Sequence, residues 1–110
     1  MPSKIILKIT QGSLCGREFV FDETACCIVG RADDCSPQLP SDEAHRTVSR
    51  HHCLLDINPP DIRVRDFGSL NGTYVNRQPR LQPGNPVELK SGDEIIIGKT
   101  FLKLTIEPLS

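Results

Sequence analysis

Residues 48–52, Val-Ser-Arg-His-His, bring a hydroxyl, a guanidinium and two imidazoles together in one short segment. Ser49 and Arg50 are residue types that together bind phosphate well, because a hydroxyl adds a hydrogen bond to the forked, charge-assisted contact of a guanidinium. The apolar residues 53–55 follow directly and predict a strand, so the polar group stands where a loop enters that strand. The plainer alternative is a loop serine, a surface arginine and a core histidine bonded to the backbone.

Two further segments place polar groups where a strand gives way to a loop. In residues 28–31, Ile-Val-Gly-Arg, an apolar strand ends at Gly30, whose missing Cβ permits a sharp turn or a close backbone approach, and Arg31 projects beyond it. Asn71-Gly72 between apolar runs is a strong hairpin signal. A binding role requires the Asn71 amide to face a ligand, with Gly72 supplying a positive φ. A plain turn and a solvated arginine are the alternatives.

The elements that must position these residues are strands, because the dominant hydrophobic period is two. Nine prolines and eight glycines separate the short apolar runs, which is typical of an all-β sandwich or barrel. We expect strands at 4–10, 17–21, 26–30, 52–57, 61–66, 73–76, 94–97 and 100–107, with shorter ones near 80–82 and 86–89.

Composition restricts the class of protein. The 110 residues fit one domain spanning 1–110, with 37% hydrophobic and 25% charged residues and a net charge of −1. That charge argues against a nucleic-acid binder with a broad basic face. We find no apolar stretch of membrane-spanning length and no secretory signal. Five cysteines, an odd number, favour free thiols in a reducing, cytoplasmic setting.

Taken together, the ordered motifs resemble the forkhead-associated (FHA) domain family. The segments that carry the resemblance are 28–31, 39–40, 48–52, 66–76 and the Gly-Asp strand entry at 92–98. The resemblance covers nearly the whole chain. It implies an all-β fold, a twisted antiparallel β-sandwich of about eleven strands with its ligand held by loops at one end. It also implies a non-enzymatic module that recognises phosphothreonine peptides in signalling.

The resemblance also assigns roles to individual residues. Arg31, Ser49 and Arg50 would contact the phosphate or the peptide, and Asn71 would hold the peptide main chain after the phosphothreonine. Three more residues are candidate peptide contacts: Thr47, Ser69 and Leu70. Three others are expected to be architectural: Gly30, His52 and Gly72. Leu70 is a departure, because some family members carry a hydroxyl there.

The expected partner is a phosphothreonine-containing protein, with no nucleic acid, no membrane, no cofactor and a monomeric domain. One alternative is a phospho-independent interaction or assembly module of the same fold. Another is the N-terminal regulatory domain of a larger signalling protein, such as a kinase or a cyclase. Both alternatives accept the fold, and the phospho-independent module differs from the main interpretation in what the loops bind.

Two unrelated functions are less favoured by the residues. Ser49, His52 and Asp66 supply the residue types of a hydrolase triad, but no Gly-x-Ser-x-Gly elbow is present. We also expect no metal site, since no Cys-x-x-Cys pair exists and His52 and Cys53 point oppositely on a strand. The residues weighed for a metal were Cys35, His45, His51, His52 and Cys53.

Overall fold

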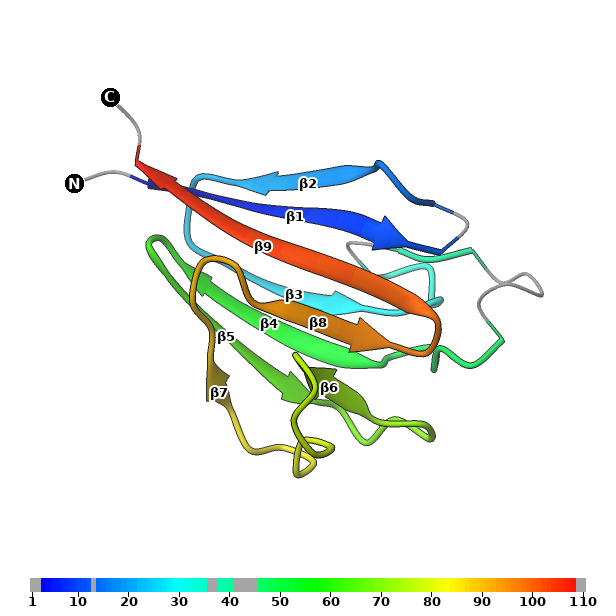
Figure 1. Ribbon diagram of the computed structural model, residues 1–110. Coiled ribbons are helices and arrows are strands. Elements are labelled where there is room, and N and C mark those ends of the chain that lie inside the picture. The colour runs from blue at the N-terminus through cyan, green and yellow to red at the C-terminus, as the bar shows by residue number, and fades with distance from the viewer. Residues whose placement is uncertain (1–2, 13, 36–37, 41–45, 109–110) are drawn as a thin grey trace.

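Two antiparallel sheets make up the described part of the chain, residues 3–12, 14–35, 38–40 and 46–108 of the computed structural model (Figure 1). The first sheet has the strand order β2-β1-β9-β8-β6 and the second has the order β3-β4-β5-β7. Their bounds are β1 Ser3–Gln11, β2 Glu18–Phe21, β3 Ala25–Val29, β4 Cys53–Asn58, β5 Asp61–Asp66, β6 Thr73–Val75, β7 Val87–Glu88, β8 Glu94–Ile97 and β9 Thr100–Pro108. These residues contain no helix, which confirms the all-β prediction.

The period-two pattern has its expected cause. On β1, Ile5, Leu7 and Ile9 are buried and alternate with more exposed residues, and β5 repeats this with Ile62 and Val64. Because successive side chains of a strand point to opposite faces, each sheet buries one apolar face against the other. The core that forms between the sheets holds the two layers, and therefore the loops at their ends, in fixed relative positions.

The direction of three consecutive strands decides where the loops lie. β3 pairs antiparallel with β4, and β4 with β5. The chain leaving β3, the chain entering β4 and the chain leaving β5 therefore all lie at one end of this sheet. Figure 1 shows this end at the right, opposite the β4–β5 turn. The three motif segments found in the sequence are thus brought to the same end.

The strand expectations were wrong in one detail. The described residues contain nine strands rather than about eleven, and no strand forms at 80–82. Pro79 and Pro83 flank that segment, and a proline has no N–H to donate to a ladder. The segment instead makes backbone hydrogen bonds outside any strand pair: Leu81 N donates to Thr73 O at 3.0 Å, and Gln82 O accepts from Asn85 N at 3.1 Å. The expected strand at 86–89 is present as the two-residue β7.

The five cysteines are free thiols in this structure. Cys35 and Cys53 are buried, whereas Cys15 and Cys26 are exposed. The described part of the chain contains no helix with the length and apolar character that a membrane span requires.

Candidate functional site

The loop after β3 runs directly against the loop before β4. Arg31 N donates to Ser49 O at 3.3 Å, and Ala32 N donates to Arg50 O at 3.0 Å. A Cβ at Gly30 would overlap the carbonyl oxygen of Arg50, so only glycine fits this approach. The missing Cβ of Gly30 therefore lets the two loops pack backbone to backbone.

The Arg31 side chain is half-buried and held in place from one side. Its Nε donates to the carbonyl oxygen of Val48. Among the described residues its two Nη groups have no hydrogen-bond partner, so they remain available to an external acceptor. A guanidinium fixed through Nε presents those Nη donors in one orientation, which suits a forked contact with a phosphate.

His52 is fully buried and joins two of the loops. Its Nδ1 accepts a hydrogen bond from Ser49 N at 3.0 Å, and its Nε2 donates to Gly72 O at 2.8 Å. These two backbone partners define a neutral imidazole with its proton on Nε2. Burial lowers the pKa of His52, which keeps the ring neutral. The residue therefore braces the site and does not face a ligand.

Two more hydrogen bonds connect the same loops nearer the surface. Leu70 N donates to Ser49 Oγ at 3.1 Å, and Asn71 Nδ2 donates to Thr47 O at 2.9 Å. Within the part of the chain that the structure describes, the Ser49 hydroxyl is only an acceptor, so its proton can be donated to an anion. The Asn71 carbonyl oxygen likewise keeps its acceptor capacity within the described structure.

The buried carboxylate of Asp66 organises the loop after β5, a structural role that was not predicted from the sequence. Asp66 accepts hydrogen bonds from Gly68 N, Ser69 N, Ser69 Oγ and Thr73 Oγ1. Burial acts to raise the pKa of this carboxyl, but the hydrogen bonds from Ser69 and Thr73 and from the backbone outweigh it and lower the pKa. The Asp-x-Gly-Ser spacing is a local turn signal that could have identified this role.

Gly72 occupies a position that no other residue fits without strain. Its φ is +88°, and a Cβ there would lie 2.6 Å from Arg80 Nε. Arg80 Nη2 donates to Ser69 O at 2.8 Å, which fixes the arginine across the loop. The sequence predicted the positive φ at Gly72 but gave no sign of Arg80, because the contact depends on how the chain returns after β6.

The structure therefore brings Arg31, Ser49 and Asn71 to one end of the sandwich, and the exposed Arg50 follows Ser49 directly. Together they offer guanidinium, hydroxyl and amide groups suited to a dianionic phosphate joined to a peptide chain. Leu70, 83% exposed, stands beside them.

Two expected contacts are placed differently. Ser69 is only 4% exposed, and its hydroxyl donates to Asp66 and accepts from Gly72 N. The Thr47 hydroxyl oxygen is buried and has no hydrogen-bond partner within the described structure. Neither side chain reaches the surface with its hydroxyl, which corrects the expectation of contact through these groups. Thr47 contributes its carbonyl instead, by holding Asn71.

Ser49, His52 and Asp66, the residue types of a hydrolase triad, do not form a catalytic triad in the structure. Both ring nitrogens of His52 are bonded to the backbone, and Asp66 bonds to Ser69 and Thr73 rather than to the imidazole. Neither His52 nor Asp66 is therefore placed to act as a base for the Ser49 hydroxyl.

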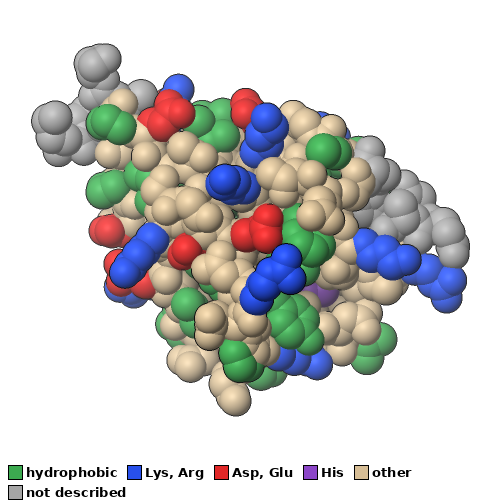
Figure 2. All heavy atoms as spheres, in the orientation of Figure 1, with side chains coloured by type: hydrophobic (Ala, Val, Ile, Leu, Met, Phe, Trp, Pro, Cys, Tyr) green, Lys and Arg blue, Asp and Glu red, His purple; other side chains and the backbone are tan. Residues whose placement is uncertain are grey.

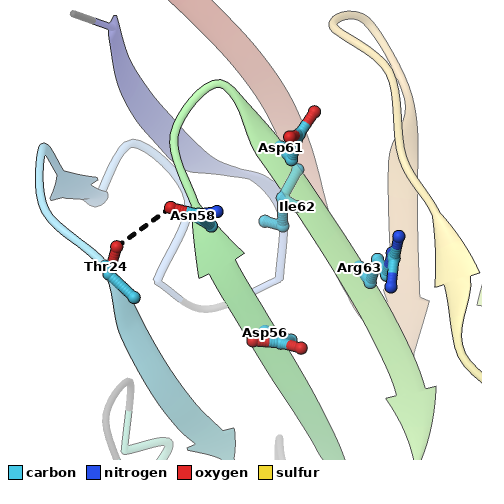
Figure 3. A pocket seen from close by; sticks show the side chains of 6 residues that line it. All are labelled: Thr24, Asp56, Asn58, Asp61, Ile62 and Arg63. Carbon is cyan, nitrogen blue, oxygen red and sulfur yellow. Dashed lines mark hydrogen bonds between the residues drawn. The ribbon is translucent and has the colours of Figure 1, made fainter.

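A surface hollow lies at the opposite end, over the β4–β5 turn (Figure 3). It is lined by Thr24, Asp56, Asn58, Asp61, Ile62 and Arg63, and Thr24 Oγ1 donates to Asn58 Oδ1 at 3.0 Å. Asp56 and Arg63 are cross-strand partners here. Figure 2 shows basic and acidic side chains interspersed on the face it presents. The hollow is shallow surface between strands, remote from the loops that hold Arg31 and Asn71.

Comparison with known proteins identifies the family. Residues 27–98 match the family model described as FHA domain. The chain belongs to the FHA family. The match begins in β3 and ends after β8, so it includes every loop of the site described above. FHA membership thus confirms the resemblance that the motifs indicated.

Curated relatives of this FHA chain are regulators and inhibitors by name. It is 42% identical over 103 residues to the oxoglutarate dehydrogenase inhibitor of Corynebacterium efficiens, covering 94% of this chain and 66% of the relative. It is 38% identical over 107 residues to the glycogen accumulation regulator GarA of Mycobacterium tuberculosis, covering 97% of this chain and 60% of the relative. The chain thus spans less than two thirds of the length of these relatives.

Solved FHA structures share the fold. One, from a study of phosphothreonine-dependent FHA domain interactions, has 29% identity and a TM-score of 0.77, covering 96% of this chain and 99% of that one. Another is EmbR of Mycobacterium tuberculosis in complex with a low-affinity phosphopeptide, with 25% identity and a TM-score of 0.77, covering 97% of this chain and 25% of that one.

Proposed function

We propose that this FHA domain binds phosphothreonine peptides and thereby mediates phosphorylation-dependent association with a partner protein. The observation that carries the proposal is the convergence of three groups on one surface. These are the free Nη donors of Arg31, the free hydroxyl proton of Ser49 and the Asn71 amide. A phosphothreonine carries about −1.5 to −2 charge at pH 7 and three acceptor oxygens, which these donors match.

The residues have distinct roles in this proposal. Arg31 and Ser49 bind the phosphate, Arg50 adds a further positive charge, and Asn71 bonds to the peptide main chain. Charge-assisted hydrogen bonds contribute roughly 1.5–3 kcal/mol each, so two or three of them, together with the bonds from Asn71 to the peptide main chain, are compatible with a micromolar interaction of about −8 kcal/mol. Gly30, His52 and Gly72 hold the loops in position and make no contact with the ligand.

The relatives suggest the physiological setting. They are named as an inhibitor and as a regulator, and we infer that this chain likewise controls a partner by binding it rather than by catalysis. The hydrogen bonds between both His52 nitrogens and the backbone support the non-enzymatic role, because they keep this imidazole from acting as a base for Ser49. Five unpaired thiols support a reducing, cytoplasmic location. The proposed domain is monomeric and binds neither nucleic acid nor membrane.

The test is calorimetric titration of peptides selected from a degenerate phosphothreonine library, each paired with its unphosphorylated form. We expect binding only to the phosphorylated peptide. Equal binding of both forms would instead support a phospho-independent interaction module.

Variants then assign the contacts. Arg31→Ala should weaken phosphopeptide binding by about tenfold or more, and Ser49→Ala should weaken it by less. Arg63→Ala, an exposed arginine at the remote hollow, is the matched control and should bind normally. Normal binding by Arg31→Ala would overturn the role given to Arg31.

A further inference from the structure

Three side chains beside the phosphate-binding loops direct three different metal-ligand atoms toward one another. The carboxylate of Asp34, the thiol of Cys35 and the imidazole of His51 place their ligand atoms within 4.8 Å of one another. His51 Nε2 and Asp34 Oδ1 are 2.9 Å apart. This set differs from the one weighed in the sequence, because it includes Asp34 and leaves out His52 and Cys53. His45 lies outside the described residues.

The separations suit a small tetrahedral ion. Ligand atoms about 2.0–2.3 Å from zinc stand about 3.3–3.8 Å apart across a tetrahedron. In this structure His51 Nε2 and Asp34 Oδ1 are 2.9 Å apart, and no two of the three ligand atoms are more than 4.8 Å apart. These distances lie on either side of the tetrahedral range, so small side-chain rotations would bring the three atoms to one ion. Asp34 and His51 lie toward the surface, which leaves a path of entry and room for one more ligand.

The backbone holds the inner part of this cluster before any ion binds. Cys35 N donates to Ala32 O at 3.0 Å, which closes a turn, and the Cys35 thiol donates to Arg50 O at 3.1 Å, a bond that an ion would replace. Ala32 N also donates to Arg50 O. The segment that carries Asp34 and Cys35 is thus tied to the residue immediately before His51, although the two segments are distant in the sequence.

Charge and burial are compatible with a divalent cation. Cys35 is 7% exposed, and burial raises the pKa of its thiol, so a metal would bind by displacing that proton. An ionised Asp34 and a Cys35 thiolate together balance a charge of +2. The nearby guanidinium of Arg50 opposes a cation, and the exposure of that side chain limits its effect.

We propose that Asp34, Cys35 and His51 bind one zinc ion and leave its fourth position open to water. Thiolate, imidazole and carboxylate are the ligand types that zinc takes, and a thiolate disfavours magnesium and calcium. None of its three ligands is a residue assigned to the phosphopeptide, so the site stands or falls independently of the proposed function.

Cobalt titration of the reduced, chelator-treated chain tests the site directly, because cobalt reports its ligands in its absorption spectrum. We expect one equivalent of Co²⁺ to give a near-ultraviolet thiolate charge-transfer band and the visible bands of tetrahedral cobalt. Added Zn²⁺ should remove both. Absence of these bands with excess Co²⁺ would overturn the proposal.

Variants separate this site from other thiols. Cys35→Ser should abolish the charge-transfer band, and Asp34→Asn and His51→Gln should weaken Co²⁺ binding by about tenfold or more. Cys26→Ser removes an exposed thiol elsewhere, on β3, and should leave the spectrum unchanged. A band that persists in Cys35→Ser, or an affinity unchanged in both Asp34→Asn and His51→Gln, would refute the assignment. Far-ultraviolet circular dichroism checks that each variant is folded.

Discussion

Replacing His52 is the sharpest test of how the loops are held. The side chain is fully buried, and its two ring nitrogens pair with Ser49 N–H and Gly72 C=O. His52→Ala leaves both backbone groups without partners, which costs about 1–3 kcal/mol each, and also opens a cavity. We expect the free energy of unfolding to fall by about 3–6 kcal/mol. In a domain of this size each kcal/mol lowers the thermal midpoint by about 4 °C, giving a fall of about 12–24 °C.

Two conservative variants divide that loss between the two hydrogen bonds. In His52→Asn the amide oxygen takes the place of Nδ1 and keeps the bond from Ser49 N. In His52→Gln the longer amide reaches the Nε2 position and keeps the bond to Gly72 O. Each should recover part of the midpoint, measured by circular dichroism and by urea unfolding. A fall of less than about 3 °C for His52→Ala would refute the reasoning, as would Asn and Gln variants no more stable than the alanine variant.

Three further predictions concern pH, backbone strain and the buried carboxylate. Because the pKa of folded His52 lies below its usual 6.5, the unfolded chain takes up the proton first as pH falls. The contribution of His52 to the free energy of unfolding should therefore be full above about pH 6.5 and decline below it. Urea unfolding of His52→Gln should lose this part of the pH dependence. Gly72→Ala should lower the free energy of unfolding by about 1–3 kcal/mol, because alanine is strained at this positive φ and its Cβ would meet Arg80. Gly84→Ala is the control, since Gly84 has φ +76° but no atom within 4 Å of an added Cβ, and it should show only the cost of the strain. Equal thermal midpoints for the two variants would contradict the contact argument. The Asp66 carboxylate accepts four hydrogen bonds, and in Asp66→Asn one of its oxygens becomes an NH2 group that can only donate. This change should lower the free energy of unfolding by about 2 kcal/mol or more. The exposed Asp56→Asn should lower it by about 0.5 kcal/mol or less in the same unfolding assay.

Strands and turns were predictable because their signals are local. Alternation along residues 4–10 and 61–66 follows directly from the two-residue repeat of a strand with one buried face. Glycine at positions 30 and 72 reported a close approach and a positive φ, because both depend on the missing Cβ at that one residue. The strand expected at 80–82 was wrong because the flanking prolines outweighed a short apolar signal.

Contacts between loops were harder to predict. The local turn signal around Asp66 was present in the sequence, but its burial and its bond to Thr73 were not visible there. Arg80 reaches Ser69 only because the chain doubles back after β6. The grouping of Asp34 and Cys35 with His51 likewise depends on two loops packing backbone to backbone.

The sequence by itself determined the all-β class, the FHA motifs and their order, because periodicity and turn chemistry act over a few residues. Tertiary structure decided that Arg31, Ser49 and Asn71 share one surface. Antiparallel pairing of β3, β4 and β5 returns the chain to the same end of the sheet each time, and His52 then ties two of the returning loops together. That convergence depends on hydrogen bonds between distant residues, which no short window of sequence contains.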